Sequence, residues 1–193
     1  MPVKVIEEAL SKGTEYGTIP IRFEVASRFR VEPMKQGLEG IRLIEEPVAP
    51  PYIKDYDDVE NESPARWLKQ WDTSNWGMFS AFDGAQRAGG AVIAGRTPNV
   101  NMMEGRDDLA VLWDLRVHPD YRGQSIGHQV FNAAVAWAKE GQYIELKIET
   151  QNNNVPACRF YARQGCILSS IVTHAYDEFS DEIQFIWRLK LKQ

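Results

Sequence analysis

Five apolar residues in the second half of the chain follow the spacing of one helix face: Ile126, Val130, Ala133, Ala134 and Trp137. They stand at positions i, i+4, i+7, i+8 and i+11, so a helix that begins near residue 126 turns all of them toward the protein interior. The apolar run LAVLWDLRV, residues 109–117, precedes them and predicts a buried strand. The pattern therefore predicts a buried strand that leads into an amphipathic helix.

Apolar runs and alternating apolar and polar positions predict further strands. The expected strands are 19–31, 40–48, 143–150, 166–176 and 182–191, and WGMFSAF and GGAVIAG are expected to form a hairpin around the turn DGAQRA. Two shorter helices are expected. One spans 63–71, with Ser63 as N-cap and Pro64 in its first position, and the other spans 154–164. Residues 97–108 read as a loop, and the whole order predicts an α+β domain around a mixed sheet.

The stretch YRGQSIG, residues 121–127, forms the corner between the strand and the long helix. A helix start offers unpaired N–H groups and the positive end of the helix dipole, so it can bind an anion. Gly123 and Gly127 let the backbone turn and approach a ligand, and Arg122 adds a charge-assisted contact to a phosphate. A tight turn with a solvated arginine explains these residues equally well. The spacing matches neither a P-loop nor the dinucleotide-binding motif.

Two motifs together resemble the GNAT superfamily of N-acetyltransferases. The corner is similar to that family's acetyl-CoA pyrophosphate loop, R/Q-x-x-G-x-G/A, with Arg122, Gly123, Gln124, Ser125, Ile126 and Gly127. The stretch NVPACRFYARQG is similar to the family's N-x-x-A-x-x-F-Y-x-x-x-G, with Asn154, Ala157, Phe160, Tyr161 and Gly165 in the matching places. Ser125 replaces the usual middle glycine, and Cys166 stands where a phenylalanine is common. The resemblance implies acetyl-CoA as cofactor and one GNAT domain over residues 1–193, with a mixed, mostly antiparallel central sheet flanked by helices.

Within the superfamily the chain resembles streptothricin acetyltransferases. The likeness rests on EPVAPPYIKDYD (46–57), IETQNNNVPACRFY (148–161) and the tail AYDEFSDEIQFIWRLKL, and it covers roughly residues 45–192. It implies that Tyr52, Tyr56, Tyr176 and Asp177 lie near the acceptor amine. Without the resemblance, these residues are aromatic anchors of loops and strand ends.

The resemblance also assigns the chemical roles. Tyr161 becomes the general acid that protonates the CoA sulfur; the alternative is a core aromatic on its helix. Leu115, Arg116 and Val117 belong to the strand whose backbone N–H groups bind the pantetheine arm and polarise the carbonyl. Asn154 caps its helix and steadies the cofactor arm. His128 closes the corner, where it contacts the cofactor or simply occupies a surface position.

An amine acceptor is mostly protonated at neutral pH, so a carboxylate must take up its proton, directly or through water. Glu149 and Asp114 are the candidates, because they stand near the ends of strands expected to be neighbours. The alternative for each of them is a structural role as a hydrogen-bond partner. The acidic stretch YDDVENE (56–62) is either a solvated loop or, through Asp57, Asp58 or a neighbour, an entry for a polyamine-like acceptor.

The composition of the chain limits the classes of binding partner that are expected. The chain has 193 residues, 44% of them hydrophobic, which suits one core, and 27 acids against 22 bases without a basic aromatic cluster argue against nucleic acid. No run is long enough for a membrane span and the N-terminus carries no signal-type segment, so a cytoplasmic enzyme with a small-molecule amine substrate is expected. The oligomeric state stays open, a homodimer included.

The remaining chemistry-bearing residues are few. Two cysteines, Cys158 and Cys166, predict buried free thiols, and three separated histidines give no metal-ligand spacing. Two rival functions stay open. One is a GNAT enzyme for another amine, such as a protein N-terminus, a polyamine or an aminoglycoside-like drug. The other is an acyl-CoA-binding sensor without turnover.

Overall fold

A computed structural model describes residues 3–58, 63–176 and 181–191. Its contacts divide the chain into two compact units. Unit 1 comprises residues 1–21, 55–148 and 188–193, and unit 2 comprises residues 22–54 and 149–187. The expectation of one domain over the whole chain stays a prediction.

The described residues form two sheets. The larger has seven strands in the order β1-β4-β5-β6-β7-β9-β8, and the smaller pairs β2 with β3. The strands are β1 Lys4–Glu8, β2 Phe23–Pro33, β3 Ile41–Lys54, β4 Trp76–Asp83, β5 Gln86–Gly95, β6 Leu109–Val117, β7 Glu145–Gln151, β8 Ile167–Val172 and β9 Gln184–Lys190. The pairs β1–β4, β4–β5 and β5–β6 are antiparallel and β6–β7 is parallel, which confirms the predicted α+β fold with a mixed, mostly antiparallel sheet.

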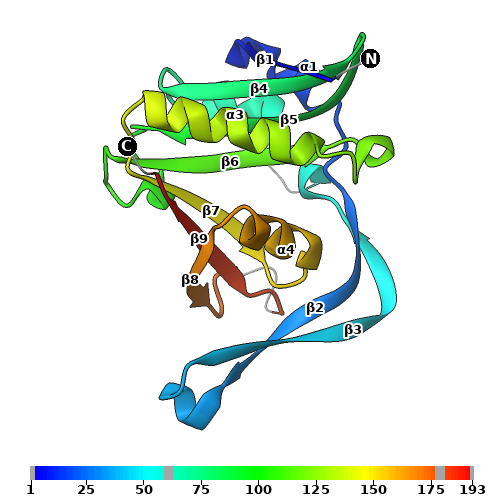
Figure 1. Ribbon diagram of the computed structural model, residues 1–193, viewed down its shortest axis with the longest axis vertical. Coiled ribbons are helices and arrows are strands. Elements are labelled where there is room, and N and C mark those ends of the chain that lie inside the picture. Colours follow the sequence, from blue (N-terminus) through cyan, green and yellow to red (C-terminus); the bar gives the residue numbers. More distant parts are fainter. Residues whose placement is uncertain (1–2, 59–62, 177–180, 192–193) are drawn as a thin grey trace. The chain divides into compact units, whose positions relative to one another are not determined.

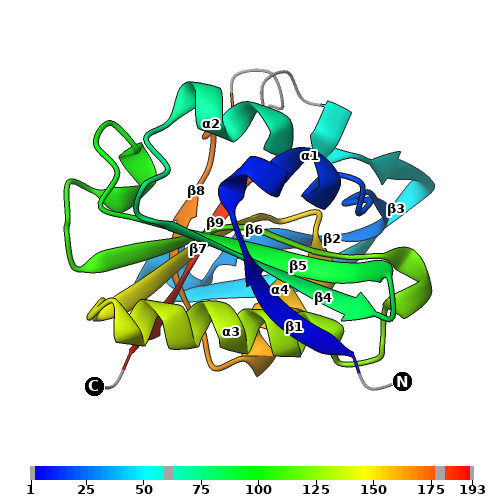
Figure 2. The same cartoon turned by 90° about the horizontal axis from the view of Figure 1, so that it is seen from above.

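Unit 1 is a three-layered structure. Helix α3 (Ile126–Glu140) covers one face of strands β4, β5 and β6, and the short helices α1 (Gly13–Tyr16) and α2 (Trp67–Gln70) lie on the opposite face (Figure 2). Aromatic rings fill the second of these layers. Trp76 lies 6.4 Å from Trp67 and 4.8 Å from Trp113 between ring centroids. The rings around Trp113 therefore pack against one face of β6, and α3 packs against the other.

Unit 2 combines the long β2–β3 ribbon, helix α4 (Val155–Arg163), β8, the later part of β7 and the first part of β9 (Figure 1). Buried polar side chains tie these pieces together. The Trp187 indole donates to the Thr150 hydroxyl at 2.9 Å, and the Asn152 amide donates to the Phe29 carbonyl at 3.0 Å. The Asn152 side-chain oxygen also accepts from the Ile183 N–H at 3.0 Å, so both ends of this amide bond to backbone groups.

The predicted helices and strands agree best with the structure where a long, regular sequence pattern predicted them. The strand 109–117 and the helix that begins at Ile126 are confirmed at those residues. The strand expected at 19–31 begins later, at Phe23, and the helix expected at 63–71 is a 3₁₀ turn, Pro64–Arg66, followed by the four-residue α2. Ser63 occupies the N-cap position but makes no capping hydrogen bond. Within the described residues, no helix is long and apolar enough to cross a membrane.

Candidate active site

Strand β6 carries an irregularity next to the predicted corner. Val92 pairs with Asp114, but the next residue of β5, Ile93, pairs with Leu112, so Trp113 is an extra residue on β6. Such a β-bulge changes the local direction of a strand. The parallel ladder with β7 ends at the same place, with the pair Leu112 and Ile148. Beyond it, β6 continues to Val117 along β5 alone within the described pairing.

The backbone of this last part of β6 offers donors at its open edge. The His118 N–H donates to the Ala88 carbonyl of β5 at 2.9 Å. Because N–H groups alternate sides along a strand, those of Leu115 and Val117 point to the edge away from β5. The described β6–β7 ladder does not reach them. These two N–H groups are therefore suited to bind a ligand, as the sequence predicts for this strand.

The corner after β6 has the backbone of an anion site. A 3₁₀ turn, Pro119–Tyr121, leads to Gly123 and Ser125, which have φ angles of +78° and +62°, and α3 follows at once. The Arg122 guanidinium donates to the Val117 carbonyl at 3.3 Å, and the Gln124 amide donates to the Asp120 carbonyl at 3.0 Å. The 15-residue helix α3 begins at this point, and the N–H groups of its first turn have no acceptor within the helix. They fit the phosphate of a cofactor.

Gly127 differs from the expectation. It is the second residue of α3 and has a helical backbone, so Gly123 alone of the two glycines supplies a left-handed turn. His128 is exposed on the first turn of α3, where one ring nitrogen lies 2.9 Å from the Asn132 amide.

Helix α4 in unit 2 places the residues of the second motif. The Asn154 side chain accepts from the Ala157 N–H at 3.2 Å, which confirms the predicted cap. Tyr161 lies in the last turn of the helix with 7% of its surface exposed, and its ring lies edge-on to that of Phe160 at 5.2 Å between centroids. The phenol is thus held in a nearly closed environment, which suits a directed proton donor as well as a core aromatic.

The two candidate bases have different surroundings. The Asp114 side chain is 7% exposed and accepts from Tyr16 at 2.5 Å and from Arg116 at 2.9 and 2.6 Å. Glu149, in unit 2, is half-buried. Its Oε1 accepts from the Tyr176 hydroxyl at 2.6 Å and from the Gln151 amide at 3.4 Å. Among the described contacts, Glu149 Oε2 carries no hydrogen bond.

The acceptor residues implied by the resemblance fall in both units. Tyr52 is 45% exposed, and its hydroxyl accepts from the Asn153 amide at 3.1 Å in unit 2. Tyr56 lies in unit 1, in the 3₁₀ turn Tyr56–Asp58. Asp177 lies outside the described residues. The Tyr176 hydroxyl bonds directly to the candidate base Glu149.

Comparison with known proteins decides the family. The model of the Acetyltransferase (GNAT) family matches residues 42–166, which is more than half of the chain. The chain belongs to the GNAT family of acetyltransferases. It is 28% identical to the streptothricin acetyltransferase of Escherichia coli, over 97% of this chain and 94% of that protein. It is also 28% identical to streptothricin acetyltransferase A of Bacillus subtilis, over 76% of this chain and 78% of that protein.

A solved structure agrees with this assignment. A Bacillus anthracis protein crystallised with acetyl coenzyme A superposes with a TM-score of 0.76 and 26% identity, covering 98% of this chain and 99% of that one. The GNAT chain described here is thus an acetyl-CoA-dependent acetyltransferase, and its open β6 edge and left-handed corner fit that cofactor.

The departure from the GNAT loop motif has a structural cost. Ser125 stands at the usual middle glycine and is held at φ +62°, ψ +10°, without a capping hydrogen bond from its side chain. A residue with a Cβ pays about 1–2 kcal/mol in this conformation, whereas glycine does not. The family preference for glycine therefore reflects backbone geometry at this position.

Ser125→Gly is expected to raise the free energy of unfolding by about 0.5 kcal/mol, because the relief of strain exceeds the extra freedom of glycine in the unfolded chain. Urea unfolding measures this difference. The matched control is Ser125→Ala, which removes the hydroxyl but keeps the Cβ and should give no gain. A glycine variant less stable than the alanine variant would contradict the strain at Ser125.

Both thiols of the GNAT chain are free and buried, as predicted. Burial raises the pKa of Cys158 to about 11 and that of Cys166 to about 12. We expect iodoacetamide at pH 8 to label neither thiol in the native protein and both after unfolding, as read by intact mass, because only the thiolate reacts. Rapid native labelling would contradict the burial.

The free energy of unfolding should also fall as the pH rises above about 9, because the two thiols lose their protons at lower pH in the unfolded chain than in the folded protein.

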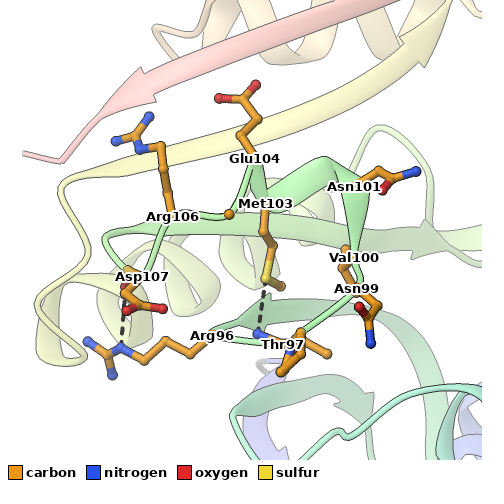
Figure 3. Close-up of a pocket in the computed structure, with 11 residues that line it drawn as sticks. Arg96, Thr97, Asn99, Val100, Asn101, Met103, Glu104, Arg106 and Asp107 are labelled. Carbon is orange, nitrogen blue, oxygen red and sulfur yellow. Dashed lines mark hydrogen bonds between the residues drawn. The ribbon is translucent and has the colours of Figure 1, made fainter.

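A cavity of about 440 Å³ lies in the loop between β5 and β6 (Figure 3). No predicted site residue lines it. The Thr97 N–H donates to the Met103 sulfur at 3.2 Å across it, and Glu104 is paired with Lys147 at 2.8 Å and Arg188 at 2.6 Å. Its charged groups are thus largely committed within the protein, and we assign no ligand to it.

Sequence reasoning missed two residues that bond to the candidate bases, Tyr16 and Gln151, and it missed the pairing of Asp57 with Arg116. Gln151 was detectable, because it stands two residues after Glu149 and so shares its strand face. An acid and an arginine two residues apart in an apolar strand also signalled a buried ion pair at Asp114 and Arg116. The Tyr16 contact and the Asp57–Arg116 pair had no local signal in the sequence.

Proposed function

We propose that this acetyltransferase transfers the acetyl group of acetyl-CoA to a primary amine of a streptothricin-type antibiotic. The observation that carries the proposal is the 28% identity to two streptothricin acetyltransferases, one of them matched over 97% of the chain. Acetyl-CoA supplies the acetyl group as an activated thioester. We further propose that the enzyme acts in the cytoplasm on this small-molecule amine.

On the donor side, the corner would hold the pyrophosphate. Arg122 and the backbone of Gly123 to Gly127 would contact it, with the helix dipole of α3 adding to the attraction. The N–H groups of Leu115 and Val117 would donate to the pantetheine arm and to the thioester oxygen. Such donors lower the barrier because they are already oriented where negative charge develops. Asn154, Ala157 and Phe160 would steady the arm from α4.

Tyr161 is our proposed general acid. A tyrosine phenol is a proton donor at neutral pH and can give its proton to a departing thiolate. Its low exposure on α4 supports this role, because a packed side chain is held in place.

Glu149 is our proposed general base, in preference to Asp114. A base must present a free oxygen to the ammonium group or to a connecting water. Asp114 is almost completely enclosed by Tyr16 and Arg116, whereas Glu149 is half-buried and bonded through Oε1. Tyr176 then orients Glu149 rather than only contacting the acceptor. Tyr52, Tyr56 and Asp177 remain proposed acceptor contacts.

Mass spectrometry with acetyl-CoA and a panel of amines tests the proposal. The panel contains streptothricin, a polyamine, an aminoglycoside and a peptide with a free N-terminus. We expect streptothricin to gain one acetyl group, with a kcat/KM at least tenfold above every other amine. Preferential acetylation of another amine would keep the enzyme and reject the substrate, and a binder of acetyl-CoA without any product would contradict the activity.

A further inference from the structure

One buried arginine of unit 1, Arg116, joins polar groups from three segments of that unit. The Arg116 side chain is 1% exposed, and all five of its N–H donors have acceptors within 3.2 Å. Two bonds go to each of the carboxylates of Asp114 and Asp57, and one goes to the carbonyl of Ile19 at 3.1 Å. A guanidinium bound in this fork-like manner fixes the orientation of its partners as well as their distance.

The two carboxylates bind differently. Asp114 stands on β6 itself, two residues before Arg116, and its pairing therefore stays within one strand. Asp57 comes from the 3₁₀ turn Tyr56–Asp58, and it lies 2.9 and 3.2 Å from the two terminal guanidinium nitrogens of Arg116. The Asp57 side chain is 28% exposed, against 7% for Asp114. Asp57 is thus the partner that can change without opening the core.

The turn itself is ordered around this contact. The Asp57 N–H donates to the Asp55 carboxylate at 3.1 Å, which shapes the backbone so that the Asp57 side chain faces Arg116. Tyr56 lies between these two acids. Holding Asp57 on Arg116 therefore holds the backbone of Tyr56 beside the strand that carries the cofactor-binding N–H groups of Leu115 and Val117.

We propose that Asp57 is a positioning residue for acceptor specificity: its ion pair with Arg116 fixes residues 55–58, and with them Tyr56, on β6. The inference rests on the proposed function, in which Tyr56 contacts the acceptor. Loss of the ion pair leaves the cofactor edge of β6 intact, because Asp114 still binds Arg116. The loss should therefore weaken binding of the acceptor and not binding of acetyl-CoA.

Steady-state kinetics of Asp57→Asn test the role. We expect the acceptor KM to rise at least tenfold, while the KM for acetyl-CoA stays within twofold. Asp72→Asn is the matched control, because it removes an exposed carboxylate of unit 1 whose described bond is to the Ser74 N–H, and it should change neither KM. An equal rise in acceptor KM with Asp58→Asn would overturn the positioning role in favour of a general charge effect.

A double-mutant cycle between Asp57→Asn and Tyr56→Ala locates the action. If Asp57 acts through Tyr56, the double variant is little worse than Tyr56→Ala alone; additive losses would overturn the proposal. If streptothricin is not a substrate, the cycle uses whichever amine is acetylated, and only the proposed substrate is rejected.

Hydrogen exchange of residues 55–58 tests the ion pair without any turnover. Exchange should accelerate in Asp57→Asn and not in Asp72→Asn, and equal protection would refute the ion pair's role.

Discussion

Tyr161→Phe is expected to lower kcat about 10- to 1,000-fold while the dissociation constant of acetyl-CoA changes less than twofold. The substitution removes one hydroxyl from a side chain that is 7% exposed in α4, and the ring keeps its place beside Phe160. A lost proton donor affects the transition state and not the bound cofactor, so the defect should appear in kcat rather than in binding. Turnover assays and calorimetry with acetyl-CoA measure the two quantities.

Tyr143→Phe is the matched control for this prediction. Tyr143 is 2% exposed in unit 1, stacks on Trp137 at 5.6 Å and belongs to no proposed site. The same loss of a buried hydroxyl there should leave kcat within twofold. A Tyr161→Phe enzyme as active as its parent removes Tyr161 from the mechanism, and weaker acetyl-CoA binding with unchanged kcat makes it a binding residue.

Arg116→Met is expected to lower the free energy of unfolding by about 3–5 kcal/mol. Methionine fills much of the space but leaves Asp114 charged, enclosed and without its cation. Burial lowers the pKa of Arg116, but the charge and hydrogen bonds of Asp114 outweigh it, so the pKa of the guanidinium is raised. Burial and the same carboxylate also raise the pKa of Tyr16 well above its usual range. Arg116 and Asp114 thus form one buried ion pair. Denaturant unfolding of Arg116→Met measures the free energy lost when this pair is broken.

Two further variants sharpen the stability prediction. Arg30→Met removes an arginine that is 45% exposed and paired with Glu46, and we expect a change below about 1 kcal/mol. The double variant Arg116→Met, Asp114→Leu should regain part of the lost stability, because the unpaired buried charge is gone. An Arg116→Met change as small as that of Arg30→Met would contradict the buried network.

Local sequence determined the elements that build the cofactor side. The strand Leu109–Val117 follows from an unbroken apolar run, and α3 follows from helical spacing after Ser125. The cap by Asn154 is equally local, since the side chain and the N–H of Ala157 lie three residues apart. The family was suggested by two short sequence motifs, and both could be identified without knowledge of the fold.

Short elements were harder to predict. β1 and α1 comprise five and four residues, too few for a periodic pattern to differ from chance, and neither was predicted. The left-handed backbone of Ser125 was also hidden, because serine gives no sign of a positive φ. Its position in a glycine motif was the only hint.

Only the tertiary structure showed how the surroundings of the two candidate bases differ. Asp114 and Glu149 look alike in sequence, each near the end of a strand. The partners that enclose Asp114 come from elsewhere: Tyr16 lies 98 residues before it, and Asp57 reaches its partner Arg116 across 59 residues. Sequence spacing fixes which residues share one strand or helix face, because that depends on backbone geometry. Which side chains meet across such distances is set only when the chain packs, and so the choice between the two bases depends on the folded protein.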